Sequence, residues 1–311
     1  MKKAATILVL AAWSLAAQAQ SICNSGARIV SQNGTYWVVD GGNFTLKSES
    51  PGYTASLNNL TITGTAGLAL TASSLLPLSG NWLNNGTFSP ANGSTITLNG
   101  SSAQSMGGTG TNTFSNLTLN NTAGVTLGSN ITTNGTLDFL NGILTTGTYS
   151  ATIGVSGSIT NAGDSKYING KLAQTFNAVG SKSFPIGKGG SYRPLTFQYS
   201  GLTGTSVVTA EQFESGLTGT LPSNATLLTS GRYWSLSQLG GSAPQYFVSL
   251  DATGYSPTGT VVILKKSSGG VIESSATTTP NYTNTVALSS FGDLGLGELG
   301  CVNPTNGGEI A

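Results

Sequence analysis

The sequence predicts an all-β protein in which an N-terminal β-solenoid, similar to a parallel β-helix, is followed by an antiparallel β-sandwich of the Ig-like type. Three observations support this prediction. Charged residues make up 7% of the chain, against about 25% in ordinary soluble domains. Short segments of alternating apolar and polar residues recur about every 20 residues in the first half. Longer alternating segments, separated by turn-forming residues, fill the second half.

The first 19 residues have the features of a secretory signal peptide. Lys2 and Lys3 precede an apolar run, and Ala17-Gln18-Ala19 forms a small-x-small cleavage site. We therefore expect export, with a mature chain that begins at Gln20. A lipid anchor on Cys23 is disfavoured, because the preceding residue, Ile22, is not small.

Residues 20–170 are predicted to form the solenoid, including an N-terminal cap. Between Pro51 and Gly163 the only charged residue is Asp138. Short strands are followed by asparagines spaced by 21, 21 and 20 residues, namely Asn99, Asn120, Asn141 and Asn161. Such a period suits six or seven stacked coils. The asparagine amides are expected to stack as a ladder.

Residues 171–299 are predicted to form the sandwich. Its candidate strands are "RPLTFQYS", "GRYWSLS", "QYFVSLD", "TVVILKK", "NTVALSS" and "DLGLGEL". Leu195, Phe197 and Tyr199 share one face of a strand, and Trp234 is assigned to the core because it shares a face with Leu236. Residues 300–311 are interpreted as a linker, or as the start of a further repeat.

The segment "SFPIGKGGSYRPL" at Ser183–Leu195 has some features of a phosphate-binding loop. That loop requires a glycine five residues before the Gly-Lys pair, where this chain has Lys182. It also requires a Ser or Thr directly after the lysine, where this chain has Gly189 after Lys188. The related dinucleotide motif must open a helix, whereas an alternating segment follows here. The segment therefore predicts a tight glycine turn between two strands.

Several phrases together resemble large secreted or cell-surface, adhesin-like repeat proteins of Bacteroidota, which are usually exported by the type IX pathway. They are "ARIVSQNGTYWVVDGGNFTL", "FSNLTLNNTAGVTLGSNITTNGTLDFLNGIL", "YINGKLAQTF", "SFPIGKGGSYRPLTF", "GRYWSLS" and "FGDLGLGE". The resemblance implies a solenoid followed by a sandwich, and a secreted or cell-surface location in a Gram-negative bacterium. The closing "NPTNGGEIA" is similar to the opening of a further Ig-like repeat, so we expect the native product to extend past Ala311.

The sequence argues against catalysis. It contains no histidine, which excludes Ser-His-Asp and Cys-His chemistry. Asp138 stands alone in the solenoid, and the odd offset between Glu211 and Glu214 places them on opposite faces of a strand. The segment "DATGYS" at Asp251 is interpreted as a turn rather than a calcium loop. We therefore expect no enzyme activity, no metal and no cofactor.

The charge balance limits the partners. Without Lys2 and Lys3, ten basic residues face eleven acidic ones, so no basic surface for nucleic acid is expected. No segment after the signal peptide has the length of apolar residues that spans a bilayer. Cys23 and Cys301 are either disulfide-bonded, within or outside the chain, or free.

Three non-catalytic functions follow. The first is a structural or adhesion module. The second is a carbohydrate-binding module for a neutral polysaccharide, with candidate glycan contacts at Tyr36, Trp37, Lys188 and Arg193. Lys182, Lys188 and Arg193 are an alternative set of contacts for an acidic glycan. All three are also compatible with solvated charges beside a hairpin. Ice binding is the third, and it is disfavoured because no threonine pair recurs on every coil.

Overall fold

The computed structural model of the chain describes residues 35–40, 43–46, 57–227, 231–266, 270, 272–278 and 282–299. All regular secondary structure in these ranges is β-strand, which confirms the predicted all-β class. They divide into two compact units, with the division between Ala162 and Gly163; the sequence prediction placed it at residue 170. The predicted signal peptide, both cysteines and residues 300–311 lie outside the described residues.

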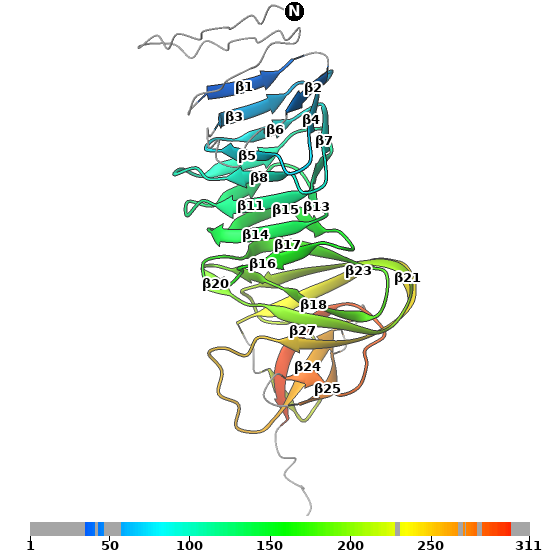
Figure 1. Cartoon of the computed structure of the whole chain (residues 1–311). Helices are drawn as coiled ribbons and strands as arrows, with labels where there is room; N and C mark the ends of the chain where they lie inside the picture. Colours follow the sequence, from blue (N-terminus) through cyan, green and yellow to red (C-terminus); the bar gives the residue numbers. More distant parts are fainter. Residues whose placement is uncertain are drawn as a thin grey trace, which may run out of the picture. The chain divides into compact units, whose positions relative to one another are not determined.

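The first unit is a β-solenoid built from parallel ladders (Figure 1). One ladder contains β1 (Thr35–Val39), β3 (Leu57–Ile62), β6 (Trp82–Asn84), β9 (Gln104–Gly107), β12 (Val125–Leu127) and the start of β15 (Leu144–Ile153). A second contains β5 (Leu75–Leu78), β8 (Thr95–Leu98), β11 (Asn116–Asn120), β14 (Thr136–Asn141) and β16 (Ser158–Thr160). The six strands of the first ladder correspond to six coils and confirm the predicted stacking.

Two further sets of strands complete the coils. β2 (Asn43–Leu46) pairs with β4 (Gly67–Leu70), which pairs with β7 (Thr87–Pro90). β10 (Asn112–Phe114) pairs with β13 (Ile131–Thr133), which pairs with the end of β15. β15 therefore turns a corner of the solenoid and belongs to two ladders.

Alternation along each short strand decides which side chains fill the solenoid. In β8, Ile96 and Leu98 are buried, whereas Thr95 and Thr97 are only partly buried and lie on the other face. The same positions repeat one coil later as Leu117 and Leu119 in β11. A full burial of each such side chain is worth about 1.5–3 kcal/mol, so the stacked coils provide the hydrophobic stability that one coil lacks.

Asparagines connect successive coils at the corners. The predicted amide ladder is present where Asn141 Nδ2 donates to Asn120 Oδ1 at 2.7 Å. Asn161 departs from it, because its Nδ2 donates to Asp138 Oδ1 at 2.7 Å. A second arrangement is more frequent: an asparagine Oδ1 accepts from a backbone N–H of the next coil, 20 to 24 residues on. These pairs are Asn59 with Asn81, Asn81 with Ser105, Asn85 with Thr109, Asn116 with Thr136, and Asn130 with Ser150.

The second unit is mainly antiparallel. Its strands are β17 (Ile168–Phe176), β18 (Gly180–Phe184), β19 (Ile186–Lys188), β20 (Ser191–Tyr192), β21 (Leu195–Phe213), β22 (Ala225–Leu227), β23 (Tyr233–Leu250), β24 (Thr260–Lys266), β25 (Ile272–Thr278), β26 (Thr283–Asn284) and β27 (Asp293–Leu299). β21 and β23 pair along their length, with irregular register between Tyr199 and Ser206. Both strands bend there (Figure 1), and Gly204, Gly240 and Gly241 adopt positive φ.

The predicted glycine turn is confirmed. β19 and β20 form an antiparallel hairpin, and its two turn residues, Gly189 and Gly190, have φ of +61° and +86°. Two successive left-handed residues match the twist of the flanking strands, which explains the glycine pair.

The predicted core of the second unit is largely confirmed. Leu195, Phe197, Tyr199 and Trp234 are all at most 1% exposed. The prediction of one strand for "NTVALSS" was wrong, because β26 ends at Asn284, Val286 is 69% exposed, and Leu288 rejoins β23 through an isolated bridge to Tyr246. The asparagine explains the early end: its Oδ1 accepts from Val248 N and its Nδ2 donates to Val286 O, so side-chain bonds replace a continued ladder.

Candidate functional site

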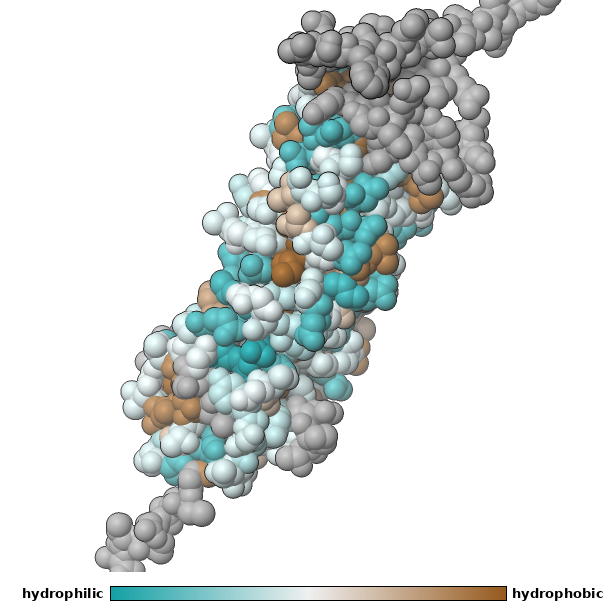
Figure 2. Space-filling model, turned by 90° about the vertical axis from the view of Figure 1, so that its left-hand side faces the viewer, coloured by the Kyte–Doolittle hydropathy of each residue, from teal (hydrophilic) through white to brown (hydrophobic). Residues whose placement is uncertain are grey.

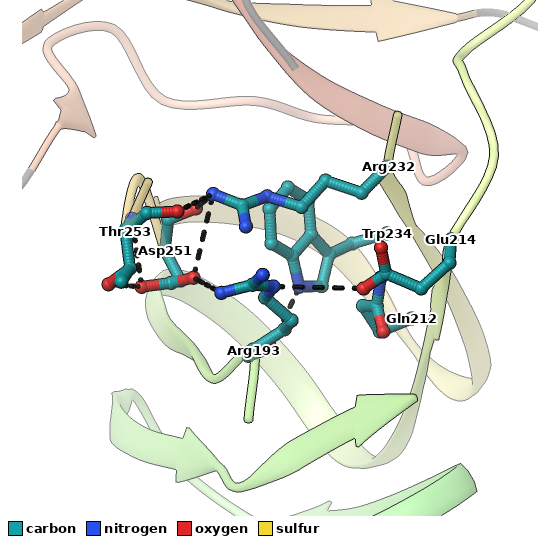
Figure 3. A network of polar contacts seen from close by, with 7 residues as sticks. All are labelled: Arg193, Gln212, Glu214, Arg232, Trp234, Asp251 and Thr253. Atoms are coloured by element: carbon teal, nitrogen blue, oxygen red, sulfur yellow. Dashed lines mark hydrogen bonds and ion pairs between the residues drawn. The ribbon is translucent and has the colours of Figure 1, made fainter. Parts of the chain in front are cut away.

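Ionised side chains of the second unit converge in one place, here called the Arg193 network (Figure 3). It consists of Arg193, Glu214, Arg232 and Asp251. Arg193 lies in the turn between β20 and β21, and Glu214 directly follows β21. Arg232 directly precedes β23, and Asp251 directly follows it. The network therefore connects the ends of two long paired strands.

Arg193 is the centre of the network. Its Nε lies 3.6 Å from Glu214 Oε1, and its Nη1 lies 3.4 Å from Asp251 Oδ2. Trp234 Nε1 donates to the Arg193 carbonyl at 3.0 Å, which fixes the backbone of this turn. Only 19% of the Arg193 side chain and 13% of the Asp251 side chain are exposed, so this pair is largely shielded from water, whereas Glu214 is 38% exposed.

Arg232 is the most buried member. Its side chain is 3% exposed, and its Nη2 donates to the carbonyls of Asp251 and Thr253 at 3.0 and 2.8 Å. The guanidinium lies 4.5 Å from the ring centroid of Tyr255 and 5.7 Å from that of Trp234. Desolvation, followed by the nearby Arg193 charge, lowers the pKa of Arg232, yet an arginine stays protonated in proteins. Carbonyls, rings and a carboxylate together compensate for its burial.

Asp251 uses both carboxylate oxygens within the network. Its Oδ2 lies 3.6 Å from Arg232 Nη2, in addition to the contact with Arg193. Its Oδ1 accepts from Thr253 N at 3.2 Å and from Thr253 Oγ1 at 2.6 Å. This geometry is an Asx turn, and it agrees with the turn that the sequence predicted for "DATGYS". Two cations and two carboxylates thus neutralise one another, so the network is suited to holding segments together rather than to binding a charged ligand.

Lys188, a predicted glycan contact, lies outside this network. Its Nζ is 4.0 Å from Glu211 Oε1 and 5.0 Å from the ring centroid of Phe213. Phe213 also stacks on Tyr233, with centroids 4.7 Å apart and planes 8° apart. Lys188 and Arg193 therefore bind different carboxylates. The other predicted contacts, Tyr36 and Trp37, belong to β1, but their side chains lie outside what the structure describes.

The remaining candidate residues also have local partners. Lys182 Nζ lies 5.3 Å from the ring centroid of Phe176, and burial lowers its pKa. Asp138 Oδ1 accepts from Thr160 Oγ1 at 2.7 Å. Glu211 and Glu214 do not act as a pair, because they bind Lys188 and Arg193 respectively.

The outward faces of the solenoid carry short polar side chains in register. In the second ladder, one column runs through Thr97, Thr118, Asp138 and Thr160. Another column, formed by β10, β13 and β15, runs through Thr113, Thr132 and Thr152. The threonine pair of β8 does not recur on β14, where Asp138 takes the second position. Figure 2 shows hydrophobic residues scattered among hydrophilic ones on the coloured part of one face, which is ordinary for a protein surface.

Metal sites and membrane-spanning helices are absent among the described residues. No group of three or more His, Cys, Asp or Glu side chains is placed to hold a metal ion there. The same residues include no helix with the length and hydropathy needed to cross a membrane.

Comparison of the chain with protein-family models, with curated proteins and with solved structures finds no match.

The sequence analysis missed most of the Arg193 network. A signal was present in "GRYWSLS", because Arg232 has the same strand parity as the core residues Trp234 and Leu236. A cation on a buried face requires a buried partner. The identity of that partner, Asp251, depends on the pairing of β21 with β23 and was not accessible from spacing alone.

Proposed function

We propose that this protein is a non-catalytic, secreted or cell-surface structural and adhesion module. The observation that carries the proposal is the β-solenoid itself, in which coils stack through their ladders and expose short polar side chains. The charged groups of the second unit support it as well, because their ion pairs hold protein segments together. The resemblance to adhesin-like repeat proteins of Bacteroidota agrees with this role, and with a Gram-negative bacterium that exports the chain after removing residues 1–19.

We further propose that the second unit is an Ig-like β-sandwich. Its pairings form a circuit in which β23 contacts β27, β27 contacts β24, β24 contacts β25, β25 contacts β26, and β26 returns to β23. The two parts of β21 pair with β18 and with β17, and the two ends of β23 pair with β26 and with β27. Such bent strands can serve both sheets, which supports a sandwich.

The proposed location is tested on intact producing cells. Antibodies against the solenoid, residues 57–160, are expected to label the cell surface or the medium, and loss of the gene is expected to reduce adherence to other cells or to polysaccharide. A lysed sample serves as the control for total protein. Labelling only after lysis, with unchanged adherence, would contradict the proposal.

Binding of a neutral polysaccharide is the second candidate. The column Thr97, Thr118, Asp138 and Thr160 favours it, because hydroxyl and carboxylate groups repeat at the coil spacing of about 4.8 Å. Such a row presents regularly spaced hydrogen-bonding groups to an extended sugar chain.

The mature chain is tested against soluble and insoluble glycans. The double variant Thr97→Val and Thr118→Val is expected to weaken binding severalfold if this column is the contact surface. The matched variant Thr132→Val and Thr152→Val changes the other column and is expected to leave binding intact, while Lys188→Ala tests the predicted contact on the second unit. If no glycan in the panel binds, the glycan-binding candidate is rejected and only the structural role remains.

A further inference from the structure

The chain enters and leaves the solenoid at opposite ends of its ladders. β1 is the first strand of one ladder, and β16 is the last strand of another. Hydrogen bonds between parallel strands run across the strands, and therefore along the direction in which the coils stack. A load applied between these two ends pulls on the bonds between coils, rather than shearing strands along their length.

The contacts of the solenoid are between nearest neighbours. Its side-chain hydrogen bonds between coils join residues that are 17 to 30 positions apart, from the Asn112 bond to Ser129 up to the buried Trp82 bond to Asn112. The corner asparagines likewise reach backbone groups only one coil away. In such a one-dimensional array, loss of a terminal coil removes only its own interface.

We infer that the solenoid is a stepwise extensible element, which under tension releases one coil at a time from an end. Each coil contains about 20 residues, as the bond from Thr136 N to Asn116 Oδ1 indicates. A released coil adds about 3.3–3.6 Å per residue and gives up about 4.8 Å of stacked length. The chain therefore lengthens by about 60–70 Å per step. Use of this property as an extensible tether rests on the proposed function, but the force response itself does not.

The experiment holds the mature chain by its two ends in an optical trap or a force microscope. A series of similar extensions of about 60–70 Å is expected, together with one larger step when the second unit unfolds. A single step that releases the whole solenoid would overturn the inference. Because surface location and adherence are measured separately on cells, failure here is distinguishable from failure of the proposed function.

A pair of variants tests the boundaries between coils. Asn116→Ala removes the acceptor for Thr136 N on the next coil and the long bond to Thr95 Oγ1 on the previous one, so the steps at these two boundaries are expected at lower force while the others keep theirs. Asn92→Ala is the control, because Asn92 is exposed in the turn from Ala91 to Ser94. This variant is expected to leave the force of every step unchanged. A lower force at every step, or at no step, would overturn the release of single coils through nearest-neighbour contacts. If Asn116→Ala fails to fold, the number and length of the wild-type steps decide the question.

Discussion

At the scale of single residues, burial determines which charges matter. Arg232 and Asp251 lie in the protein interior, where an ion pair contributes little net stability but the loss of one partner is costly. Surface pairs such as Lys188 with Glu211 are partly exposed and contribute at most about 1 kcal/mol. Removing one charge from the Arg193 network should therefore cost the second unit more stability than removing one charge from a surface pair.

Replacement of Asp251 tests this expectation. Asp251→Ala leaves Arg232, 3% exposed, without its carboxylate partner. The free energy of unfolding, measured by urea denaturation, is expected to fall by about 3–5 kcal/mol. Asp164→Ala is the matched control, since Asp164 is exposed and its loss should change stability by about 0.5 kcal/mol or less. Equal losses in the two variants would show that the network is unimportant.

At the scale of elements, two turns of the solenoid have the same left-handed position but carry different residues there. In the turn Thr71–Ser74 the third residue is Ser73, with φ of +60°, and in the turn Ala91–Ser94 it is Gly93, with φ of +79°. A side chain in this left-handed region costs about 1–2 kcal/mol. The greater freedom of glycine in the unfolded chain offsets part of that cost.

The two turns predict opposite effects for reciprocal substitutions. Ser73→Gly should raise the free energy of unfolding by about 0.5–1 kcal/mol, and Gly93→Ser should lower it by a similar amount. A Cβ on Gly93 would lie 3.7 Å from its nearest neighbours, so the effect is conformational rather than a clash. Urea denaturation of both variants is the measurement. Changes of the same sign would refute the explanation from φ.

Elements that follow from local pattern were predictable from the sequence, and those that depend on distant partners were not. The period of Asn120 and Asn141 predicted in-register coils, because neighbouring coils repeat the same positions. The bond between Asn161 and Asp138 was not visible, since a positive φ at Asn161 redirects its side chain. Strand β26 stopped early for a similar reason, as the Asn284 amide competes with the backbone ladder.

At the scale of the whole molecule, a sequence with few charges and no histidine has little that titrates near neutral pH. Titration in the interior occurs at alkaline pH instead. Desolvation first, and the neighbouring Tyr199 second, raise the pKa of Tyr246, whose hydroxyl donates to Ser290 O at 2.8 Å. Desolvation also raises the pKa of Tyr199. Both rings are at most 1% exposed.

Stability should therefore decline in alkali. The folded pKa of Tyr246 exceeds the unfolded value of about 10, so its contribution is complete below pH 10 and is lost as the pH rises toward the folded value. The urea midpoint is expected to hold up to about pH 10, the unfolded value, and to fall progressively above it. Tyr246→Phe should lower stability by about 1 kcal/mol at neutral pH and make this decline shallower. Tyr149→Phe, at a residue 38% exposed, is the control and should decline like the wild type.

The one-coil reach of the solenoid contacts also has a genetic consequence. Because Phe114 and Thr133 occupy the same register position on adjacent coils, an in-frame loss or duplication between their codons rejoins the ladder at equivalent residues. An in-frame change of this size alters the number of coils and leaves the register of the remaining coils unchanged. The length of this protein is thus open to selection in units of one coil, independently of the residues that hold the second unit together.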